Sequence, residues 1–281
     1  MVKKIIVISV TVVLIAAVAI TVPTVMHYSK KHRIEKLRSE APAPMSEEEI
    51  CYYLAARAAV DSAYAFVYNH RDSLPGSLLH AVCRNPETLT FATRFSDSVG
   101  LFADTLKAED TAGIFPFFLQ WDPRWGYAPY GDNVIGLSGC APTCLSMVAV
   151  ALTGDATYTP KYVADIASRD DCYLEGEGTK WSIFTEGCYS FGITGFDIKL
   201  KKRMIYKLLR DGTPIICSLY PGDFTSTGHF VVFHSIERDS IRLHDPNSRE
   251  RSARLYSFKD LEWQIHHLWA FSKTDTTYQE L

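Results

Sequence analysis

Several kinds of sequence signal are scarce or missing in this chain of 281 residues. Only 22% of the residues are charged and the formal net charge is −3, so no basic surface favours nucleic acid as a partner. No Cys-x-x-Cys pair and no zinc-like spacing of histidines is present, which argues against a structural zinc. The sequence also lacks a Gly-x-x-x-x-Gly-Lys-Ser/Thr phosphate loop, low-complexity segments and internal repeats. We therefore expect no cofactor, no nucleotide and no nucleic-acid partner.

Hydrophobic residues, by contrast, make up 47% of the chain, enough for one sizeable domain and an additional segment. An apolar run from Ile5 to Met26 is long enough, at about 20 residues, to cross a bilayer as a helix. A cleaved signal peptide is the alternative, but its apolar region is shorter, at roughly 7–15 residues. We therefore predict an uncleaved signal anchor over residues 5–26, after a cytoplasmic stub over residues 1–4.

The basic residues around this run leave its orientation open. Lys3 and Lys4 precede it, whereas five basic residues follow it: Lys30, Lys31, Arg33, Lys36 and Arg38. Counted alone, these charges place the C-terminal side in the cytoplasm. Long domains are nevertheless often translocated regardless of such flanking charges.

The chain has seven cysteines, an odd number that leaves at least one thiol free in an exported protein. Two pairs are candidates for disulfides, Cys51 with Cys83 and Cys172 with Cys188. The alternative is that several of the cysteines are small buried hydrophobic residues.

Two segments separate the apolar run from the main domain. Residues 27–45 are charged and end in alternating Ala and Pro, which predicts a stiff linker. Residues 46–112 are predicted to be a helical region that packs against the main domain, because Ser46 and the acids after it are typical of a helix start and apolar residues recur at helical spacing up to Tyr68. Shorter helices are predicted over Ser77–Cys83, Pro86–Phe95 and Asp97–Leu106.

Residues 113–272 are predicted to form the main domain, followed by a tail over residues 273–281. Helices are expected first and an antiparallel sheet after them, which gives an α+β fold. The expected helices are Pro142–Leu152, Lys161–Ser168, Trp181–Phe191 and Lys202–Arg210. The expected strands are Gly195–Lys199, Pro214–Leu219, Phe230–Glu237, Ser240–His244 and Leu268–Phe271, with a hairpin turn at Arg238-Asp239.

Cys140 is the candidate nucleophile. It follows Gly139, which allows a sharp turn, and it comes two residues before the predicted helix. The unpaired N–H groups and the positive dipole end of a helix start draw a thiol toward the thiolate, the form that attacks carbonyl groups. Cys144 is the competitor, but its thiol would lie beside the helix rather than at its exposed start.

A thiolate nucleophile needs a base that takes its proton and later protonates the leaving group. Of the nine histidines, His229 is best placed, because it follows Gly228 at the start of a strand, where a side chain reaches a cleft. His234 lies inside that strand and is expected to be a core or face residue. A third group should hold the imidazole in one tautomer. Asp245, which ends the neighbouring strand, is the candidate, with Asn247 in reserve.

Simple strand register does not bring His229 and Asp245 together. With a two-residue turn, Asp245 faces Val232 rather than His229. The pair meets only if His229 bends back or the hairpin carries a β-bulge. The Asp-Pro-Asn sequence that begins at Asp245 is also typical of a plain turn.

Gln120, 20 residues before Cys140, is the candidate oxyanion donor. Its side-chain N–H would act beside the backbone N–H of Cys140, and one such donor contributes roughly 3 kcal/mol to the transition state. The alternative is an ordinary polar residue at the end of a strand.

Four motifs in this order resemble the peptidase-like domains related to the bacteriocin leader-peptide (double-glycine) peptidases, a papain-type cysteine peptidase superfamily. The motifs are Gln-Trp-Asp-Pro-Arg-Trp-Gly from Gln120, Gly-Cys-Ala-Pro-Thr-Cys-Leu-Ser-Met from Gly139, Gly-His-Phe-Val-Val from Gly228 and His-Asp-Pro-Asn from His244. The resemblance covers roughly residues 116–271.

The resemblance implies a papain-like fold in which Cys140 is the nucleophile, His229 the base, Asp245 the orienting residue and Gln120 the oxyanion donor. It also implies a membrane-anchored peptidase that acts outside a Gram-positive cell on a peptide or protein. Members that process leader peptides are fused to an ABC transporter. This chain has one apolar span and no nucleotide loop, so the transport-coupled role does not carry over. A smaller departure is Ala141, where the family often has glycine.

Two other functions stay open beside this one. The first is hydrolysis of peptidoglycan peptides, although the sequence has no separate wall-binding repeat. The second is an inactive papain-like scaffold that binds a peptide, against which the intact Cys, His, Asp and Gln argue. Residues 223–228 are expected to form a rim of the cleft. Five aromatic residues are candidates for its walls, although aromatic residues more often belong to the core: Trp121, Trp125, Tyr127, Tyr130 and Trp181.

Overall fold

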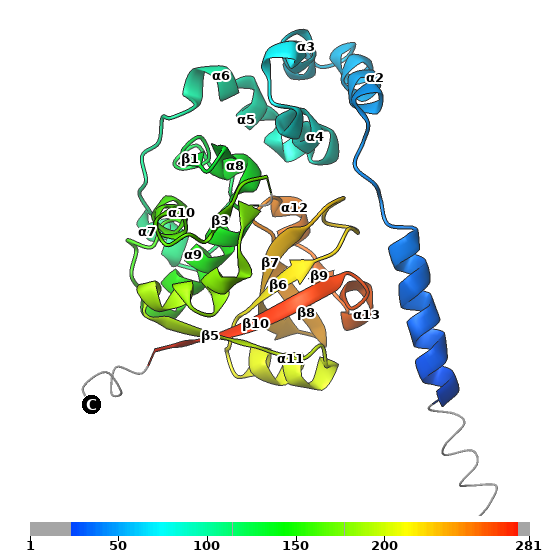
Figure 1. Cartoon of the computed structure of the whole chain (residues 1–281), viewed down its shortest axis with the longest axis vertical. Helices are drawn as coiled ribbons and strands as arrows, with labels where there is room; N and C mark the ends of the chain where they lie inside the picture. The colour runs from blue at the N-terminus through cyan, green and yellow to red at the C-terminus, as the bar shows by residue number, and fades with distance from the viewer. Residues whose placement is uncertain (1–23, 114, 177, 275–281) are drawn as a thin grey trace, which may run out of the picture.

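The structure, a computed structural model, describes residues 24–113, 115–176 and 178–274. A helix over residues 24–39 leads into a group of short helices, and a part built from helices and an antiparallel sheet follows (Figure 1). The predicted anchor lies outside the described residues except for its last three. Within the described ranges, no helix is both long enough and apolar enough to span a bilayer.

The helix over residues 24–39 covers much of the segment predicted to be a stiff linker over residues 27–45. It lies beside the sheet-containing part of the chain (Figure 1) and is attached to it by ion pairs. The buried carboxylate of Glu262 lies 2.5 Å from the Lys30 ammonium and 2.5 Å from the Arg33 guanidinium. Charged side chains therefore hold this helix against the main domain.

The helical region over residues 46–112 consists of short helices. They are α2 (Glu47–Ala58), α3 (Ser62–Asn69), η1 (Arg71–Ser73), α4 (Gly76–Arg84), η2 (Pro86–Thr88), α5 (Leu89–Thr93), α6 (Phe95–Ser98) and α7 (Ala108–Thr111). The predicted start at Ser46 is confirmed, because its hydroxyl accepts a hydrogen bond from Glu49 N. The predicted continuity up to Tyr68 is wrong, since the Asp61 side chain caps a new helix by accepting from Ala63 N.

The helix predicted over Asp97–Leu106 is also wrong. The chain leaves α6 after Ser98 and continues without regular structure. Its backbone N–H groups bond to the main domain instead, where Gly100 N donates to the Tyr127 carbonyl and Ala103 N to the Arg124 carbonyl, both at 2.9 Å. These tertiary hydrogen bonds replace the intrahelical ones that the sequence pattern favoured.

The main domain is arranged around α9 (Cys140–Thr153), whose residues from Ala141 to Val150 are all buried. The other helices are α8 (Ile135–Ser138), α10 (Pro160–Arg169), η3 (Trp181–Phe184), η4 (Gly187–Phe191), α11 (Lys202–Arg210), α12 (Arg249–Ser252) and α13 (Phe258–Leu261). The predicted helices in the regions of α9, α10 and α11 are confirmed to within two residues. The helix predicted over Trp181–Phe191 is divided into the two 3-10 turns η3 and η4.

Six strands form the main sheet, in the order β5-β10-β6-β7-β8-β9, with every neighbouring pair antiparallel. They are β5 (Ile193–Asp197), β6 (Ile215–Leu219), β7 (His229–Glu237), β8 (Ser240–His244), β9 (Leu255–Tyr256) and β10 (Ile265–Lys273). Two small hairpins lie outside it and pair β1 (Pro129–Tyr130) with β2 (Asn133–Val134) and β3 (Tyr173–Leu174) with β4 (Gly178–Thr179). Helices with an antiparallel sheet confirm the expected α+β class.

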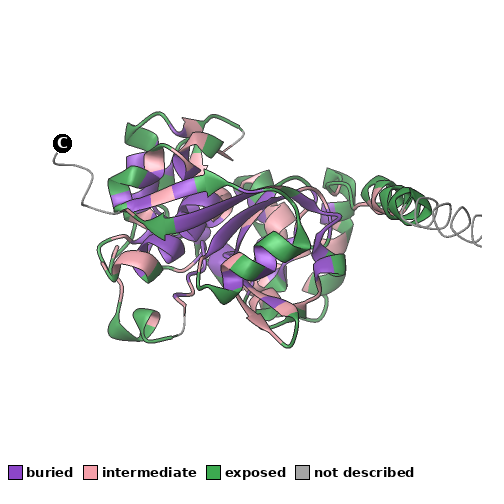
Figure 2. Cartoon of the chain, turned by 90° about the horizontal axis from the view of Figure 1, so that it is seen from below, coloured by how far each residue is buried: buried purple, intermediate pink, exposed green. Residues whose placement is uncertain are grey.

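The sheet has a hydrophobic core on each face. Ile216 and Val232 belong to the core shared with α9, whereas Ile215 and Val231 belong to the core beneath α11 and α13. This alternation is the two-residue period of a strand, and Figure 2 shows the central strands as buried. A third core joins Leu78 and other residues of the helical region to Trp121 and Val134 of the main domain. The helical region therefore packs directly against the main domain.

The hairpin between β7 and β8 turns at Arg238-Asp239, as predicted. Both residues have positive φ, 50° and 60°, which is the geometry of a type I′ turn. This turn type has the same twist as the two strands that it joins.

A β-bulge in this hairpin changes the register that the sequence predicted. The pairing shifts by one position at His234, so that Val232 lies opposite His244 rather than opposite Asp245. The shift moves Asp245 one position along β7, toward His229.

All seven cysteines are free thiols, so neither candidate disulfide is present and the alternative of small buried residues applies. Five of them are buried, as small hydrophobic residues are: Cys83, Cys144, Cys172, Cys188 and Cys217. Cys51 and Cys140 are half-buried.

Gly195 on β5 gives a direct test of the packing. A methyl group at this position would lie 1.9 Å from the Phe184 carbonyl oxygen and 2.7 Å from a ring carbon of Phe271. We expect Gly195→Ala to lower the free energy of unfolding by about 2–3 kcal/mol, because the backbone must move to make room. Denaturant unfolding followed by circular dichroism measures the change. Gly76→Ala in the open first turn of α4 is the control, and it should be neutral or stabilise by up to about 1 kcal/mol. Equal effects of the two substitutions would contradict the packing described here.

Candidate active site

Cys140 lies at the very start of α9. The helix begins at Cys140 itself, two residues earlier than predicted. Gly139 precedes it where no side chain fits, because a methyl group would lie 2.5 Å from Cγ2 of Ile135. Cys140 is half-buried and lines a cleft, whereas the next ten residues of the helix are buried. Its thiol therefore lies at the accessible, positive end of a buried helix.

Cys144, one turn further along α9, is fully buried. Burial raises the pKa of its thiol well above the usual range, and nearby groups that include Cys140 add to the rise. A protonated thiol without access to the cleft cannot attack a substrate. Of the two thiols, only that of Cys140 lines the cleft.

His229 is the first residue of β7 and is 7% exposed. Its Nε2 lies 2.7 Å from Oδ1 of Asp245, which leaves Nδ1 for the side of Cys140. Burial lowers the pKa of His229, but the charge and hydrogen bond of Asp245, together with Cys140, outweigh burial and raise the pKa to about 9. The charged imidazolium is therefore the favoured form at neutral pH.

The carboxylate of Asp245 is fully buried just beyond the end of β8. Oδ1 accepts hydrogen bonds from His229 and from Asn247 N at 2.7 Å, and Oδ2 accepts one from Arg251 Nε at 2.5 Å. Burial raises the pKa of Asp245, but His229 and then Arg251 more than compensate, and the pKa falls below its usual value. Asp245, and not its reserve Asn247, is thus the residue that the fold places against His229.

Gln120 is buried beside the same cleft, and both its backbone and its side chain are fixed by hydrogen bonds. Its backbone N–H donates to the Pro246 carbonyl at 2.7 Å, and its side-chain Nε2 donates to the Gly136 carbonyl at 3.0 Å. Its Oε1 is buried without a hydrogen-bond partner in the described part of the chain. The amide has a second N–H on Nε2, and Gln120 lines a cavity together with Cys140 and His229.

Arg251 and Glu87 complete the site, and the sequence did not identify either residue. Arg251 belongs to the four-residue helix α12, which is capped by Ser248. The Glu87 carboxylate accepts hydrogen bonds from the Ser248 hydroxyl and from Arg249 N and Glu250 N. An acid at a helix start is favourable, so η2 of the helical region stabilises the helix that presents Arg251 to Asp245. Ser248 was a visible cap signal, but nothing in the sequence related Glu87 to a helix about 160 residues away.

Two arms of one cleft meet at Cys140 and His229. The first arm has a volume of about 840 Å³ and is lined by main-domain residues, among them Trp181 and Tyr220. The second arm has a volume of about 510 Å³ and lies between the helical region and the main domain. Cys140, Thr227, Gly228 and His229 line both arms.

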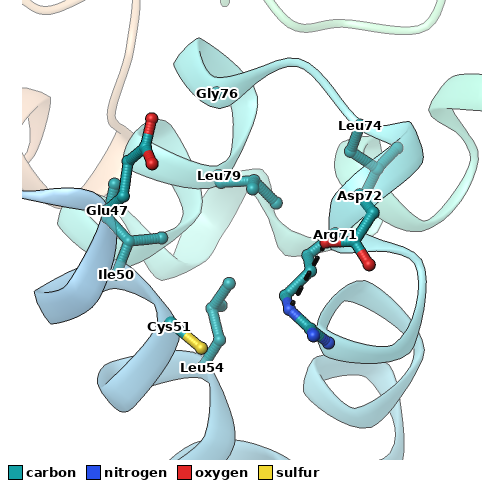
Figure 3. Close-up of a pocket in the computed structure, with 9 residues that line it drawn as sticks. All are labelled: Glu47, Ile50, Cys51, Leu54, Arg71, Asp72, Leu74, Gly76 and Leu79. Carbon is teal, nitrogen blue, oxygen red and sulfur yellow. Dashed lines mark ion pairs between the residues drawn. The ribbon is translucent and has the colours of Figure 1, made fainter.

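The expected lining residues are only partly found in the cleft. Residues 224–228 line the second arm, as expected of a rim. Of the five aromatic candidates, Trp181 lines the first arm, whereas the other four are buried. A third cavity, of about 390 Å³, lies within the helical region around Leu54, Cys51 and the Arg71–Asp72 ion pair (Figure 3). None of the four predicted site residues lines it.

Comparisons with known proteins show which family this chain resembles. A profile of the Peptidase_C39 like family matches residues 114–270. Among solved structures, the peptidase domain of Streptococcus ComA, a bifunctional ABC transporter of a quorum-sensing pathway, is similar with a TM-score of 0.38 and 18% identity over 49% of this chain and 93% of that chain. A C39-like peptidase from Bacillus anthracis is similar with a TM-score of 0.33 and 13% identity over 58% of this chain and 96% of that chain.

No curated protein matches the chain significantly. The profile match extends over more than half of the 281 residues and includes all four motifs. The chain therefore belongs to the Peptidase_C39 like family.

Proposed function

We propose that this protein is a cysteine peptidase that hydrolyses a peptide bond in a peptide or protein substrate, with Cys140 as nucleophile. The observation that carries the proposal is the buried His229–Asp245 pair, whose Nε2–Oδ1 distance is 2.7 Å, beside a half-buried Cys140 at a helix start. The family membership supports the same chemistry. Gln120 and the Cys140 backbone N–H are proposed as the oxyanion donors.

The proposed reaction moves one proton back and forth. The Cys140 thiol gives its proton to His229 Nδ1, and the Asp245 carboxylate stabilises the imidazolium through Nε2. The thiolate sulfur attacks the substrate carbonyl carbon, and the carbonyl oxygen becomes an oxyanion. His229 returns the proton to the leaving nitrogen as the C–N bond breaks. Water, deprotonated by His229, then hydrolyses the thioester and releases the acid and free Cys140.

We further propose that the chain is anchored in the membrane through residues 5–26 and acts outside the cytoplasm. The apolar run is long enough for a membrane span. The docked helix over residues 24–39 would then connect the end of the span to the peptidase domain. Protease digestion of intact cells tests the location: cleavage of the domain in intact cells supports the proposal, and protection until lysis contradicts it.

Alkylation of the full-length chain in detergent tests the nucleophile. An ordinary thiol is about 1% ionised at pH 6.5. Proton transfer to His229 should therefore speed the reaction of Cys140 with iodoacetamide by up to about 100-fold, and His229→Ala should remove most of that gain. Mass mapping at pH 6.5 measures the rate at each cysteine. Half-buried Cys51 is the internal control. Equal rates at Cys140 in both chains would mean a binding scaffold instead.

The His229 pKa can be followed directly by NMR of histidine-labelled protein. We expect its ring to titrate near pH 9, and at a lower pH in Asp245→Asn, because the carboxylate charge is lost. The folded-state pKa lies above the unfolded value of about 6.5. Protonation of His229 therefore stabilises the fold fully below pH 6.5, and this contribution is lost as the pH rises through 9.

Two other histidines provide an internal reference for that titration. Burial lowers the pKa of His234 to about 3 and that of His244 to about 4, so both rings should stay neutral above pH 6. His229→Gln identifies the signal of interest. A ring that titrates near pH 6.5 in the wild-type chain would contradict the buried ion pair.

Arg251→Met tests whether the buried carboxylate needs its second cation. The loss of one partner of a buried ion pair costs roughly 3–5 kcal/mol of unfolding free energy. Iodoacetamide labelling of Cys140 should slow as His229 loses its fixed partner. Arg254→Met, three residues further on and exposed, is the matched control, and it should change the stability by less than about 0.5 kcal/mol. Similar losses in the two variants would contradict the role given to Arg251.

A further inference from the structure

The second arm of the cleft is built from two parts of the chain. The main domain contributes Gln120, Cys140, His229 and the rim over residues 224–228. The helical region contributes the opposite wall, from α2, α4 and the segment before α2. The helical region therefore forms part of the surface that a substrate bound at Cys140 would contact.

Arg84, the last residue of α4, lies in this wall as a half-buried cation. Its guanidinium has no hydrogen-bond or ion-pair partner among the residues that the structure describes. Other partly buried arginines are paired: Arg124 with two aspartates, Arg251 with Asp245 and Arg33 with Glu262. When a substrate fills this arm and displaces its water, an unpaired guanidinium is costly without a counter-charge, so this position is suited to an anion supplied from outside the chain.

The groups around Arg84 increase the need for an anion. Burial lowers the pKa of Arg84, and the nearby charge of Arg251 lowers it further. The Nη2 of Arg251 is itself buried without a hydrogen-bond partner within the described ranges. Glu87 is already occupied by the start of α12. Glu47, the one carboxylate among the described residues that line this arm, is exposed and makes no ion pair with Arg84.

His80, on the same face of α4, adds a neutral polar group rather than a charge. Its Nε2 lies 3.3 Å from Met45 N and 3.5 Å from the Ser226 hydroxyl. Burial lowers the pKa of His80, and the charge of Arg84 lowers it further. At neutral pH, Arg84 is therefore the cation of this wall.

We propose that Arg84 is a specificity-determining residue that binds a carboxylate of the substrate in the second arm. The guanidinium presents a planar pair of donors that matches a carboxylate. The proposal rests on the proposed peptidase function and adds its substrate class: peptides with a carboxylate close to the scissile bond. The carboxylate is either an acidic side chain or a free chain terminus, because both present the same group.

Two matched alkylating reagents test the anion site without any need for turnover. Bromoacetyl-glutamate carries carboxylates, and bromoacetyl-glutaminamide is its neutral counterpart. The ratio of their rates at Cys140 of the full-length chain is the readout. We expect Arg84→Gln to lower this ratio by about tenfold, since hydrogen bonds to a charged group are worth about one order of magnitude or more. Arg84→Lys should restore part of it.

Arg249→Gln is the matched control. This substitution also removes one positive charge, but from α12 and at an exposed position that does not line either arm. An unchanged ratio in Arg84→Gln, or an equal fall in Arg249→Gln, would overturn the proposal. The neutral reagent distinguishes failure of this proposal from failure of the peptidase proposal. Because this reagent has no carboxylate, the difference between its rates at Cys140 in wild type and in His229→Ala depends on the Cys–His pair and not on Arg84. Circular dichroism verifies the fold of each variant.

Peptides distinguish the two sources of the carboxylate. A mixture of proteome-derived peptides is treated with wild type and Arg84→Gln, and the cleaved sites are sequenced, before and after amidation of the peptide C-termini. Amidation also neutralises Asp and Glu side chains, so loss of Arg84-dependent cleavage at sites without a nearby Asp or Glu indicates a free terminus, and enrichment of Asp or Glu near wild-type sites that disappears in Arg84→Gln indicates a side chain. Either result supports the proposal, and identical site profiles in both chains would contradict it.

Discussion

The carboxylate of Asp245 has no exposed surface, and a charge in such a position is stable only when donors surround it. Three donors do so: His229 Nε2, Arg251 Nε and Asn247 N. The same charge keeps the His229 ring in one orientation and raises its pKa to about 9. The hairpin, the turn after it and the helix α12 each supply a donor to the Asp245 carboxylate. All three therefore help to position His229 for the reaction proposed at Cys140.

The helical region is part of this arrangement rather than an appendage. The Asn85 side chain donates to the Asn247 carbonyl in the turn after Asp245, and Trp121 Nε1 donates to the same carbonyl at 3.1 Å. Glu87 stabilises the start of the helix that carries Arg251. The helical region therefore stabilises the turn that contains Asn247, and its residue Arg84 lines the cleft. A fragment without the helical region would lose both contributions at once.

The sequence predicted the α+β class and most of the regular elements because their signals are local. The cap at Ser46, the start of α9 after Gly139 and the two-residue turn of the hairpin are each set by neighbouring residues. The order of the four motifs was sufficient to indicate the family, which the profile match confirms. The catalytic roles of Cys140, His229, Asp245 and Gln120 stay predictions, although the fold brings the four residues together.

The features that the sequence missed or left open depend on contacts between distant residues. The sequence left open whether a β-bulge or a bend at His229 brings Asp245 to His229, and the bulge at His234 decides between them. The segment after Ser98 had a helical pattern, but tertiary hydrogen bonds from Gly100 and Ala103 prevail over it. The two candidate disulfides rested on the spacing of cysteines alone, and spacing says nothing about distance in the fold. Glu87 and Arg84 have no sequence signature, because their roles depend on where η2 and α4 pack.

The central claim is that Cys140 hydrolyses peptide bonds through a covalent intermediate. The most direct measurement is the sequencing of new peptide termini after incubation of the full-length chain with a complex peptide mixture, in parallel with Cys140→Ala. We expect new termini with the wild-type chain and none with the variant, together with a transient increase in the mass of the wild-type chain by one acyl group. New termini with both chains, or with neither, would contradict it.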